Sequence, residues 1–270
     1  MSPILVQWGN WSISVYAACL SLGLFLALMV VGLEARACHI RSAVWLDAAL
    51  AALTLGVVAA RLGYAALNWT YFQQHPLEIL EVWEGGLSWH AGLIGGSIGA
   101  WLIAHRLSDR RPIELLDTFA LALPIGLAFG WLGSYFSAAA YGRELYPGDA
   151  FFWLAVDQPD LYGLVNPRWP TQLMGAAWSG LLAVGLLLTR RYSARRHDWP
   201  AGTRFWLCLA VYSLGAFAIG FTRADDVPLL GGWRVDQLFD AVLVIAGLSQ
   251  LLRGSISARR KDAHGRLPAA

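Results

Sequence analysis

The chain has 270 residues, of which 57% are hydrophobic and only 14% are charged. Soluble domains carry roughly 25% charged residues, so this composition is typical of a membrane protein and not of a soluble one. A formal net charge of only +2 predicts no nucleic-acid partner.

Seven apolar stretches approach the length that a bilayer core requires, which is about 20 residues of helix. They lie at about 12–33, 44–67, 89–105, 113–133, 173–190, 204–222 and 236–253. Because backbone polar groups in lipid must be satisfied internally, we expect helices and not open strands. The sequence therefore predicts an all-α integral membrane protein with seven transmembrane helices. It predicts a single polytopic domain over 1–253 and a polar cytoplasmic tail over 254–270, which its composition predicts to be disordered.

The basic residues predict the orientation of these spans. Most of the 20 Lys and Arg residues lie in alternate connections and in the tail, at 36–41, 106–111, 190–204 and 253–266. The positive-inside rule then places the C-terminus in the cytoplasm and the N-terminus outside. The two long loops, at about 68–88 and 134–172, would face outward. Their mixture of aromatic, Pro, Gly and polar residues is typical of segments that lie in the membrane interface.

Residues 81–96, EVWEGGLSWHAGLIGG, turn on two glycines and place His90 where a membrane helix begins. Ionisable side chains at membrane depth are costly, so they are functional candidates. An imidazole has a pKa near neutrality and can act as a general base. The alternative is an interfacial histidine that only forms hydrogen bonds.

Two further polar residues lie within predicted spans. Arg61, near the outer end of the second span, needs an anion, a water-filled cavity or a route to the interface. It is either a ligand of a lipid phosphate or a residue that snorkels or pairs with Asp47 or Glu81. Tyr16, in the first span, is either an aromatic-belt residue or a hydroxyl that orients a headgroup.

Four arginines lie on the predicted outer side, namely Arg143, Arg168, Arg223 and Arg234. Phosphate recognition favours arginine, whose planar fork donates two parallel hydrogen bonds. Arginines that converge would bind an anionic headgroup, whereas scattered ones would only be solvated. The three cysteines (Cys19, Cys38 and Cys208) lack metal-ligand spacing, so neither a metal site nor a disulfide is predicted.

The segment VWEGGLSWHAGLIGG resembles the diagnostic segment of the prolipoprotein diacylglyceryl transferases, in which an acidic glycine-glycine turn leads to a histidine and a glycine-rich helix. Seven spans with an external N-terminus also match this family. Together the similarities extend from about Tyr16 to Gln237. The weaker ones are ARLGY at 60–64, GWLGSYFSAAAYGR at 130–143, PTQL at 170–173, FTRADD at 221–226 and the Asp236–Gln237 pair.

The resemblance implies an enzyme of lipoprotein biosynthesis in the bacterial plasma (inner) membrane. Such a diacylglyceryl transferase moves the diacylglyceryl group of phosphatidylglycerol, or of another anionic phospholipid, to a cysteine thiol of a lipoprotein precursor. The implied protein is a monomer that needs no cofactor and no metal. The thiol must become a thiolate, and the departing phosphate needs a cation as charge develops.

The resemblance also implies which residues act. His90 and Tyr16 match catalytic positions of the family. Arg61, Gly142, Gln172 and Gln237 match further motif positions around the phospholipid site, where Arg143 and Arg223 are expected to supply additional cations.

The chain departs from the family at several motif positions. Trp131 stands where the family has arginine, and a second family arginine falls near Ala216 or Ala218. The remaining departures are Ser134, Ser137, Ala139, Trp169 and Met174. Two lost phosphate donors, at roughly 1.5–3 kcal/mol each, would lower a rate by several powers of ten.

The departures leave alternatives to a divergent transferase. One is a catalytically degraded relative that binds lipid or lipoprotein. Another is an enzyme of changed substrate. A transporter is a third, although corresponding halves with broken helices, which secondary transporters often have, are not apparent.

Overall fold

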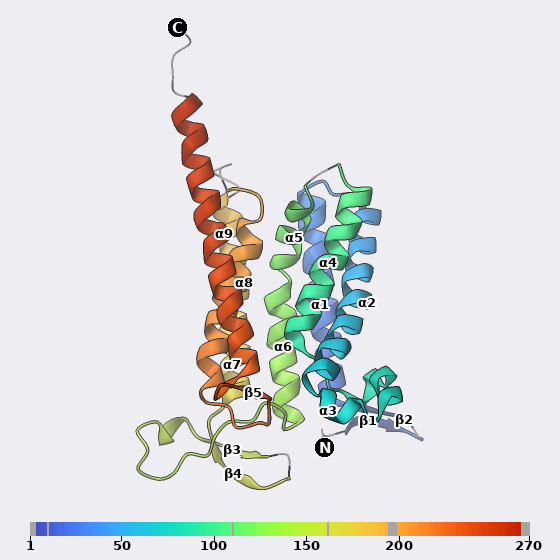
Figure 1. Ribbon diagram of the computed structural model, residues 1–270, viewed down its shortest axis with the longest axis vertical. Coiled ribbons are helices and arrows are strands. Elements are labelled where there is room, and N and C mark those ends of the chain that lie inside the picture. Colours follow the sequence, from blue (N-terminus) through green and yellow to red (C-terminus); the bar gives the residue numbers. More distant parts are fainter. Residues whose placement is uncertain (1–3, 10, 110, 161, 194–198, 266–270) are drawn as a thin grey trace. The chain divides into compact units, whose positions relative to one another are not determined.

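The computed structural model describes residues 4–9, 11–109, 111–160, 162–193 and 199–265, and most of them are helical (Figure 1). The longer helices are α1 (Val15–Ala37), α2 (Ser42–Leu67), α4 (Trp89–Leu107), α6 (Leu123–Phe136), α7 (Thr171–Ser193), α8 (Thr203–Gly220) and α9 (Val235–Gly265). The shorter helical segments are α3 (Trp69–Phe72), η1 (Pro76–Leu80), η2 (Val82–Glu84), α5 (Pro112–Ala120) and η3 (Phe152–Leu154).

Three antiparallel hairpins, which the sequence analysis did not predict, connect or precede the helices. They are β1–β2 (Ile4–Trp8 and Trp11–Ser14), β3–β4 (Val156–Pro159 and Val165–Arg168) and β5–β6 (Leu229–Leu230 and Trp233–Arg234). All are short, with two to five residues per strand. The helical character predicted for the membrane portion is confirmed.

Within the described residues, five helices are long and apolar enough to cross a membrane, which makes the chain a multi-pass membrane protein. They are Val15–Ala37, Ser42–Leu67, Thr171–Thr189, Thr203–Gly220 and Val235–Ser257, and they coincide with five of the predicted spans. The predicted span at 113–133 is a pair, α5 and α6, bent by 43° near Pro124. The predicted span at 89–105 is the helix α4, which is less apolar than the five because it contains glycines, two histidines and Arg106.

Most of the polar tail is helical, although its composition predicted disorder. Helix α9 continues through Gly265, so the prediction of disorder is wrong for 254–265. Residues 266–270 lie outside the described part of the chain, as do four basic residues used to predict the orientation, namely Arg110, Arg195, Arg196 and Arg266.

The chain divides into two compact units, and each is described by itself. Unit 1 comprises Met1–Val30, Ala120–Val227 and Asp236–Ala270. Unit 2 comprises Val31–Phe119 and Pro228–Val235. Tyr16, Gly142, Arg143, Gln172, Arg223 and Gln237 belong to unit 1, and Arg61 and His90 belong to unit 2.

The core of unit 2 is the pair α2 and α4, which run side by side (Figure 1). The two helices can approach closely because glycines of α4 lie directly on the backbone of α2. A Cβ atom on Gly95 or on Gly99 would lie 2.5 Å from a backbone oxygen of α2, at Leu55 and Ala51 respectively. Such spacings exclude any larger residue. Small residues that let two backbones approach are the usual means of packing helices in lipid.

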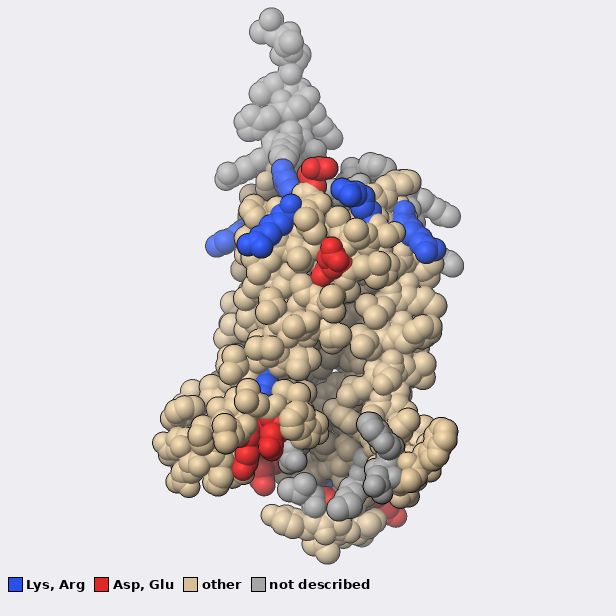
Figure 2. Space-filling model, turned by 90° about the vertical axis from the view of Figure 1, so that its right-hand side faces the viewer, with Lys and Arg blue, Asp and Glu red and all other residues tan. Residues whose placement is uncertain are grey.

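Basic side chains mark one end of unit 2. Arg36 lies in the last turn of α1, Arg41 precedes α2, and Arg106 lies in the last turn of α4. Figure 2 shows several basic side chains near one end of the face in view, while the middle of that face carries almost no charge. This distribution is typical of helices that end at a membrane surface.

In unit 1, indole rings enter the space left by glycines on neighbouring helices. The Trp131 ring of α6 lies against Gly175 of α7, and the Trp178 ring of α7 lies against Gly215 of α8. The Trp178 Nε1 donates to the Val211 carbonyl at 3.0 Å. These two insertions explain why α6, α7 and α8 pack in sequence.

Candidate active site

In unit 2, Arg61 organises the loop between α2 and α4. Its side chain is buried, with 6% exposed. Nε donates to the Ile79 carbonyl at 3.0 Å, and Nη1 donates to the carbonyls of Gly85 and Gly86 at 2.7 and 3.2 Å. Nη2 donates to the Glu78 carbonyl. Four of the five guanidinium N–H groups are thus committed to backbone oxygens of 78–86.

The glycine-glycine turn follows from this arrangement. Gly85 and Gly86 have φ angles of +88° and +64°, a region that side chains other than glycine rarely adopt. A Cβ atom on Gly86 would also lie 2.8 Å from Nη1 of Arg61. The diagnostic motif is therefore required by the path of the chain around the arginine.

The turn leads directly to His90. The Ser88 amide donates to the Ala60 carbonyl of α2 at 2.9 Å, and the Ser88 Oγ accepts from the Ala91 amide at 3.4 Å, which caps α4. His90 is the second residue of this helix, its side chain is 6% exposed, and its ring lies 5.5 Å from the Trp89 ring. The imidazole is therefore held at a capped helix start that is joined to α2.

Replacing Arg61 with lysine is expected to loosen the loop, because one ammonium group cannot serve four carbonyls spread over 78–86. We expect a loss of about 2–4 kcal/mol of stability, since each buried acceptor left unsatisfied costs roughly 1–3 kcal/mol. Thermal unfolding in micelles and the rate of proteolysis within 76–87 measure the effect. The same replacement at Arg106, at the basic end of α4, is the control. Unchanged resistance of the loop to protease would contradict the structural role of Arg61.

In unit 1, residues 141–145 form an extended strip between two other segments. On one side the Arg143 amide donates to the Thr222 carbonyl and the Ala224 amide to the Tyr141 carbonyl, at 2.8 and 2.9 Å. On the other side the Leu145 amide donates to the Pro167 carbonyl at 2.8 Å, and the Trp169 amide to the Arg143 carbonyl at 3.0 Å. The strip thus joins the β3–β4 hairpin to the loop that follows α8.

Gly142 lies in the strip where no side chain fits. A Cβ atom there would overlap the Trp169 carbonyl and lie 2.7 Å from the Trp169 Cβ. Two neighbouring polar side chains hold the adjacent turn. The Thr171 Oγ1 donates to the Ala140 carbonyl at 2.6 Å, and the Gln172 Nε2 to the Ala139 carbonyl at 2.9 Å. Gly142 and Gln172, predicted around a phospholipid site, therefore shape the backbone beside Arg143.

Replacing Gly142 with alanine is expected to push the strip away from Trp169. Overpacking of this kind costs about 1–3 kcal/mol. It should also lower transfer activity by more than about tenfold, since a displacement of 1 Å at an active site can cost 100-fold. Alanine at Gly185, whose Cβ would meet nothing within 4 Å, is the matched control. If the Gly142→Ala variant keeps the stability and activity of the unmodified protein, the strip does not position the site.

Arg168 is a structural arginine. It is 4% exposed, and its Nη2 donates to Glu144 Oε1 at 2.9 Å and to Asp160 Oδ2 at 3.1 Å. Hydrogen bonds from Asn166 and Tyr146 lower the pKa of Glu144 below its ordinary value, and the charge of Arg168 adds to this effect. These contacts hold the β3–β4 hairpin on the strip and leave Arg168 neutralised.

Arg223 is also neutralised by carboxylates. Its Nε and Nη2 donate to the two oxygens of Asp225 at 2.8 and 2.6 Å, and its Nη1 donates to Asp236 at 3.0 Å. The guanidinium carbon lies 5.9 Å from the centre of the Trp131 ring. A phosphate would have to compete with two carboxylates for this guanidinium.

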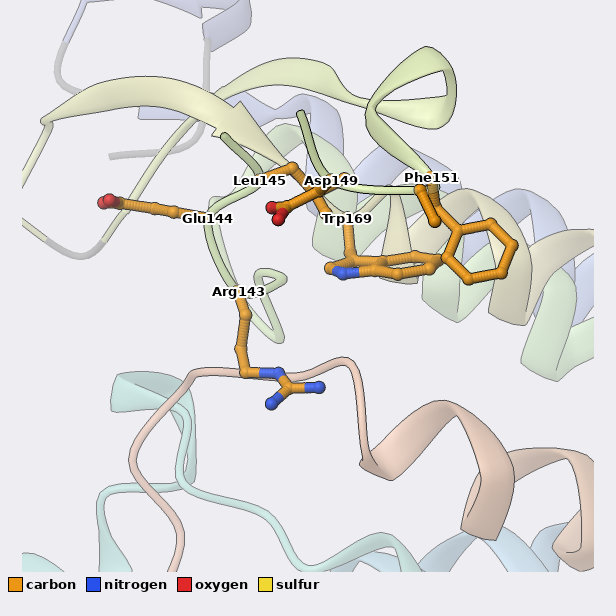
Figure 3. Close-up of a pocket in the computed structure, with 7 residues that line it drawn as sticks. Arg143, Glu144, Leu145, Asp149, Phe151 and Trp169 are labelled. Carbon is orange, nitrogen blue, oxygen red and sulfur yellow. The ribbon is translucent and has the colours of Figure 1, made fainter. Parts of the chain in front are cut away.

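Arg143 differs from both. Its side chain is exposed, and among the described residues no carboxylate pairs with it. Figure 3 shows its guanidinium turned away from the carboxylates of Glu144 and Asp149. It borders a pocket of about 350 Å³ whose other lining residues are Glu144, Leu145, Asp149, Ala150, Phe151 and Trp169. Of the predicted phosphate ligands in unit 1, Arg143 is the one whose charge is available.

Trp131 lies where the sequence resemblance predicted a family arginine. Its Nε1 donates to the hydroxyl of Tyr212 at 3.2 Å, and Tyr212 is buried. Tyr16 of α1 lies against Gly133, two residues after Trp131. The Gln237 Nε2 donates to the Phe217 carbonyl at 3.1 Å, where Gly220 leaves room for the side chain. An indole with an aromatic partner therefore stands where the sequence resemblance predicted a family arginine.

Sequence reasoning missed the pocket. Asp149 and Phe151 lie in a loop with no periodic pattern, and Trp169 was noted only as a departure from the family. The consecutive Pro147 and Gly148 were the available signal, because this pair is typical of a turn and brings the residues on either side of it together. The Asp149 Oδ2 does accept from the Tyr146 amide, at 2.8 Å.

The fold and these residues define a multi-pass membrane protein that presents an imidazole at a helix start and an arginine suited to phosphate. Residues 3–253 match the family described as prolipoprotein diacylglyceryl transferase. The chain belongs to this family, as its resemblance predicted.

Individual relatives show the same similarity over nearly the whole length. The chain is 31% identical over 264 residues to the phosphatidylglycerol–prolipoprotein diacylglyceryl transferase of Streptococcus agalactiae serotype Ia, and 98% of each chain is covered. It is 33% identical over 257 residues to the protein of the same name from Symbiobacterium thermophilum, with 92% of this chain and 91% of the relative covered.

Proposed function

We propose that this protein transfers the diacylglyceryl group of phosphatidylglycerol to the cysteine thiol of a lipoprotein precursor. The observation that carries the proposal is the available guanidinium of Arg143, in a chain that belongs to a family of such transferases. The relatives are named for this donor and acceptor. No metal or cofactor is part of the proposal.

The proposed reaction is a displacement at the glyceryl carbon that is esterified to phosphate. His90 takes the thiol proton, because only the thiolate is an effective nucleophile. Sulfur then forms a bond to this carbon while the carbon–oxygen bond breaks, which gives a thioether. The electron pair leaves with glycerol phosphate, and Arg143 stabilises the charge that develops on it. Tyr16 orients the reacting groups, and Arg61 positions the loop that leads to His90.

We propose the predicted membrane topology for this activity. The five apolar helices, the bent pair α5–α6 counted as one, and α4 would together make seven spans. The domain over 1–253 would then have an external N-terminus and a cytoplasmic C-terminus. The basic residues at one end of unit 2 support this orientation. The site would then lie at the outer face of a bacterial plasma membrane, where a monomer meets both substrates.

The test is transfer by the purified protein in vesicles of phosphatidylglycerol, with a peptide that carries a lipobox cysteine. Mass spectrometry should detect the peptide with one diacylglyceryl thioether, and glycerol phosphate should be released in equal amount. Rescue of a cell depleted of its own transferase should follow. A relative such as the streptococcal enzyme serves as the positive control.

A second function is favoured by the Trp131–Tyr212 pair, which takes the place of a motif arginine. In that case the protein is a catalytically silent relative that binds lipid or precursor. Binding without thioether formation, under conditions in which the positive control works, would establish this alternative. A transferase that uses a different lipid would form the thioether from that lipid alone.

A further inference from the structure

The pocket beside Arg143 combines three chemical features that together suit one kind of ligand. Arg143 supplies an available cation at its edge. Trp169 and Phe151 supply an aromatic wall, with ring centres 5.4 Å apart and an angle of 46° between the rings. Asp149 supplies a carboxylate, which Figure 3 shows beside the Trp169 ring. The pocket volume is about 350 Å³, and sites for small molecules span roughly 300–1,000 Å³.

The Asp149 carboxylate is held in place through one of its two oxygens, and the other oxygen can still accept hydrogen bonds. The Tyr146 amide donates to the Asp149 Oδ2 at 2.8 Å, and the Asp149 amide donates back to the Tyr146 carbonyl at 2.9 Å. Within the described chain no hydrogen bond engages Asp149 Oδ1. Glu144, the other carboxylate of the pocket, already accepts from Arg168 and Asn166. Asp149 is therefore the acceptor that a ligand would meet.

The position of the pocket relates it to the span α7. Trp169 is separated from Thr171, the first residue of that helix, by Pro170 alone. The pocket therefore lies next to the first residue of a membrane-crossing helix, and the ends of such helices lie among the lipid headgroups. A ligand that is held in the membrane by its acyl chains can present its polar end there.

We propose that this pocket binds the phosphoglycerol headgroup of the donor lipid, with Asp149 as the residue that selects the diol. Arg143 binds the phosphodiester through its planar fork. Asp149 accepts hydrogen bonds from the two glycerol hydroxyls, and the Trp169 ring packs on the C–H edge of the glycerol. The choice of phosphoglycerol rests on the proposed function, because it is the headgroup of the donor named for the relatives.

The test compares two lipids that share a phosphodiester and differ only beyond it, phosphatidylglycerol and phosphatidylmethanol. Purified protein is exposed to an equal mixture of both with matched acyl chains, and native mass spectrometry measures which lipid is retained. The same pair is then used as donors in the transfer assay. We expect the unmodified protein to retain more phosphatidylglycerol than phosphatidylmethanol. In the Asp149→Asn variant the ratio of the two retained lipids should fall by about tenfold, because one charge-assisted hydrogen bond to the glycerol is weakened.

Asparagine at position 149 keeps an oxygen that can accept from Tyr146, so the turn should be preserved. Asp157→Asn is the matched control, because Asp157 is exposed on the nearby β3–β4 hairpin and does not line the pocket. The Arg143→Lys variant should bind both lipids more weakly without changing their ratio.

Two outcomes would overturn the headgroup site: an unchanged preference in Asp149→Asn, or no preference in the unmodified protein. A preference that depends on Asp149, in a protein that transfers nothing, would retain the headgroup site and reject the proposed function.

Discussion

Replacing His90 with glutamine is expected to lower the rate of thioether formation by about 100- to 10,000-fold, the contribution typical of a general base. Glutamine keeps hydrogen-bonding capacity and approximate size but cannot take a proton. The Ser88 cap of α4 is untouched and glutamine is close to histidine in size, so the substitution should not unfold α4 although the side chain is buried. The measurement is the initial rate of peptide modification in vesicles of phosphatidylglycerol.

The control for this variant lies on the same helix. His105 is exposed in the last turn of α4, where its ring stacks on Trp101 at 5.2 Å. The His105→Gln variant should retain nearly full activity. Binding of phosphatidylglycerol should also be unchanged in His90→Gln, because the imidazole acts on the thiol and not on the headgroup. A variant that transfers at close to the normal rate would show that His90 only supports the fold.

Replacing Arg143 with glutamine is expected to reduce transfer by roughly 100-fold or more. A charge-assisted hydrogen bond contributes roughly 1.5–3 kcal/mol, and about 1.4 kcal/mol corresponds to a factor of ten in rate. The loss should appear in kcat as well as in KM, because the charge on the phosphate increases in the transition state. Rates measured over a range of phosphatidylglycerol contents separate these two effects.

The lysine variant tests whether the geometry of Arg143 matters beyond its charge. Lysine keeps the cation but loses the planar fork, so an intermediate rate is expected. Arg223 provides the contrast, since Asp225 and Asp236 already neutralise it. The proposed role of Arg143 in stabilising the departing phosphate fails if Arg143→Gln is fully active while Arg223→Gln is inactive.

Much of the fold followed from composition and pattern. Five apolar stretches were found as helices within a few residues of their predicted ends, because a long apolar segment in lipid has no other way to satisfy its backbone. The glycine-rich stretch after His90 was also correctly read as a helix. Its low hydropathy has a cause in the structure, where glycines replace larger apolar residues at the contact with α2.

The site was predicted only as a set of residues. The sequence offered Arg61, Arg143 and Arg223 as equivalent phosphate ligands, and the structure distinguishes them by their partners. Arg61 donates to loop carbonyls, Arg223 pairs with two carboxylates, and Arg143 borders an open pocket. These partners lie in loops, whose conformation depends on contacts between segments far apart in the chain.

Hydropathy and a glycine-histidine motif are properties of contiguous residues, so the order of the amino acids was enough to predict a helical membrane protein of the prolipoprotein diacylglyceryl transferase family. Which arginine has an available charge could be seen only in the folded chain. A guanidinium binds whichever acceptor the folded chain brings nearest, and that acceptor is set by packing and not by its distance along the sequence.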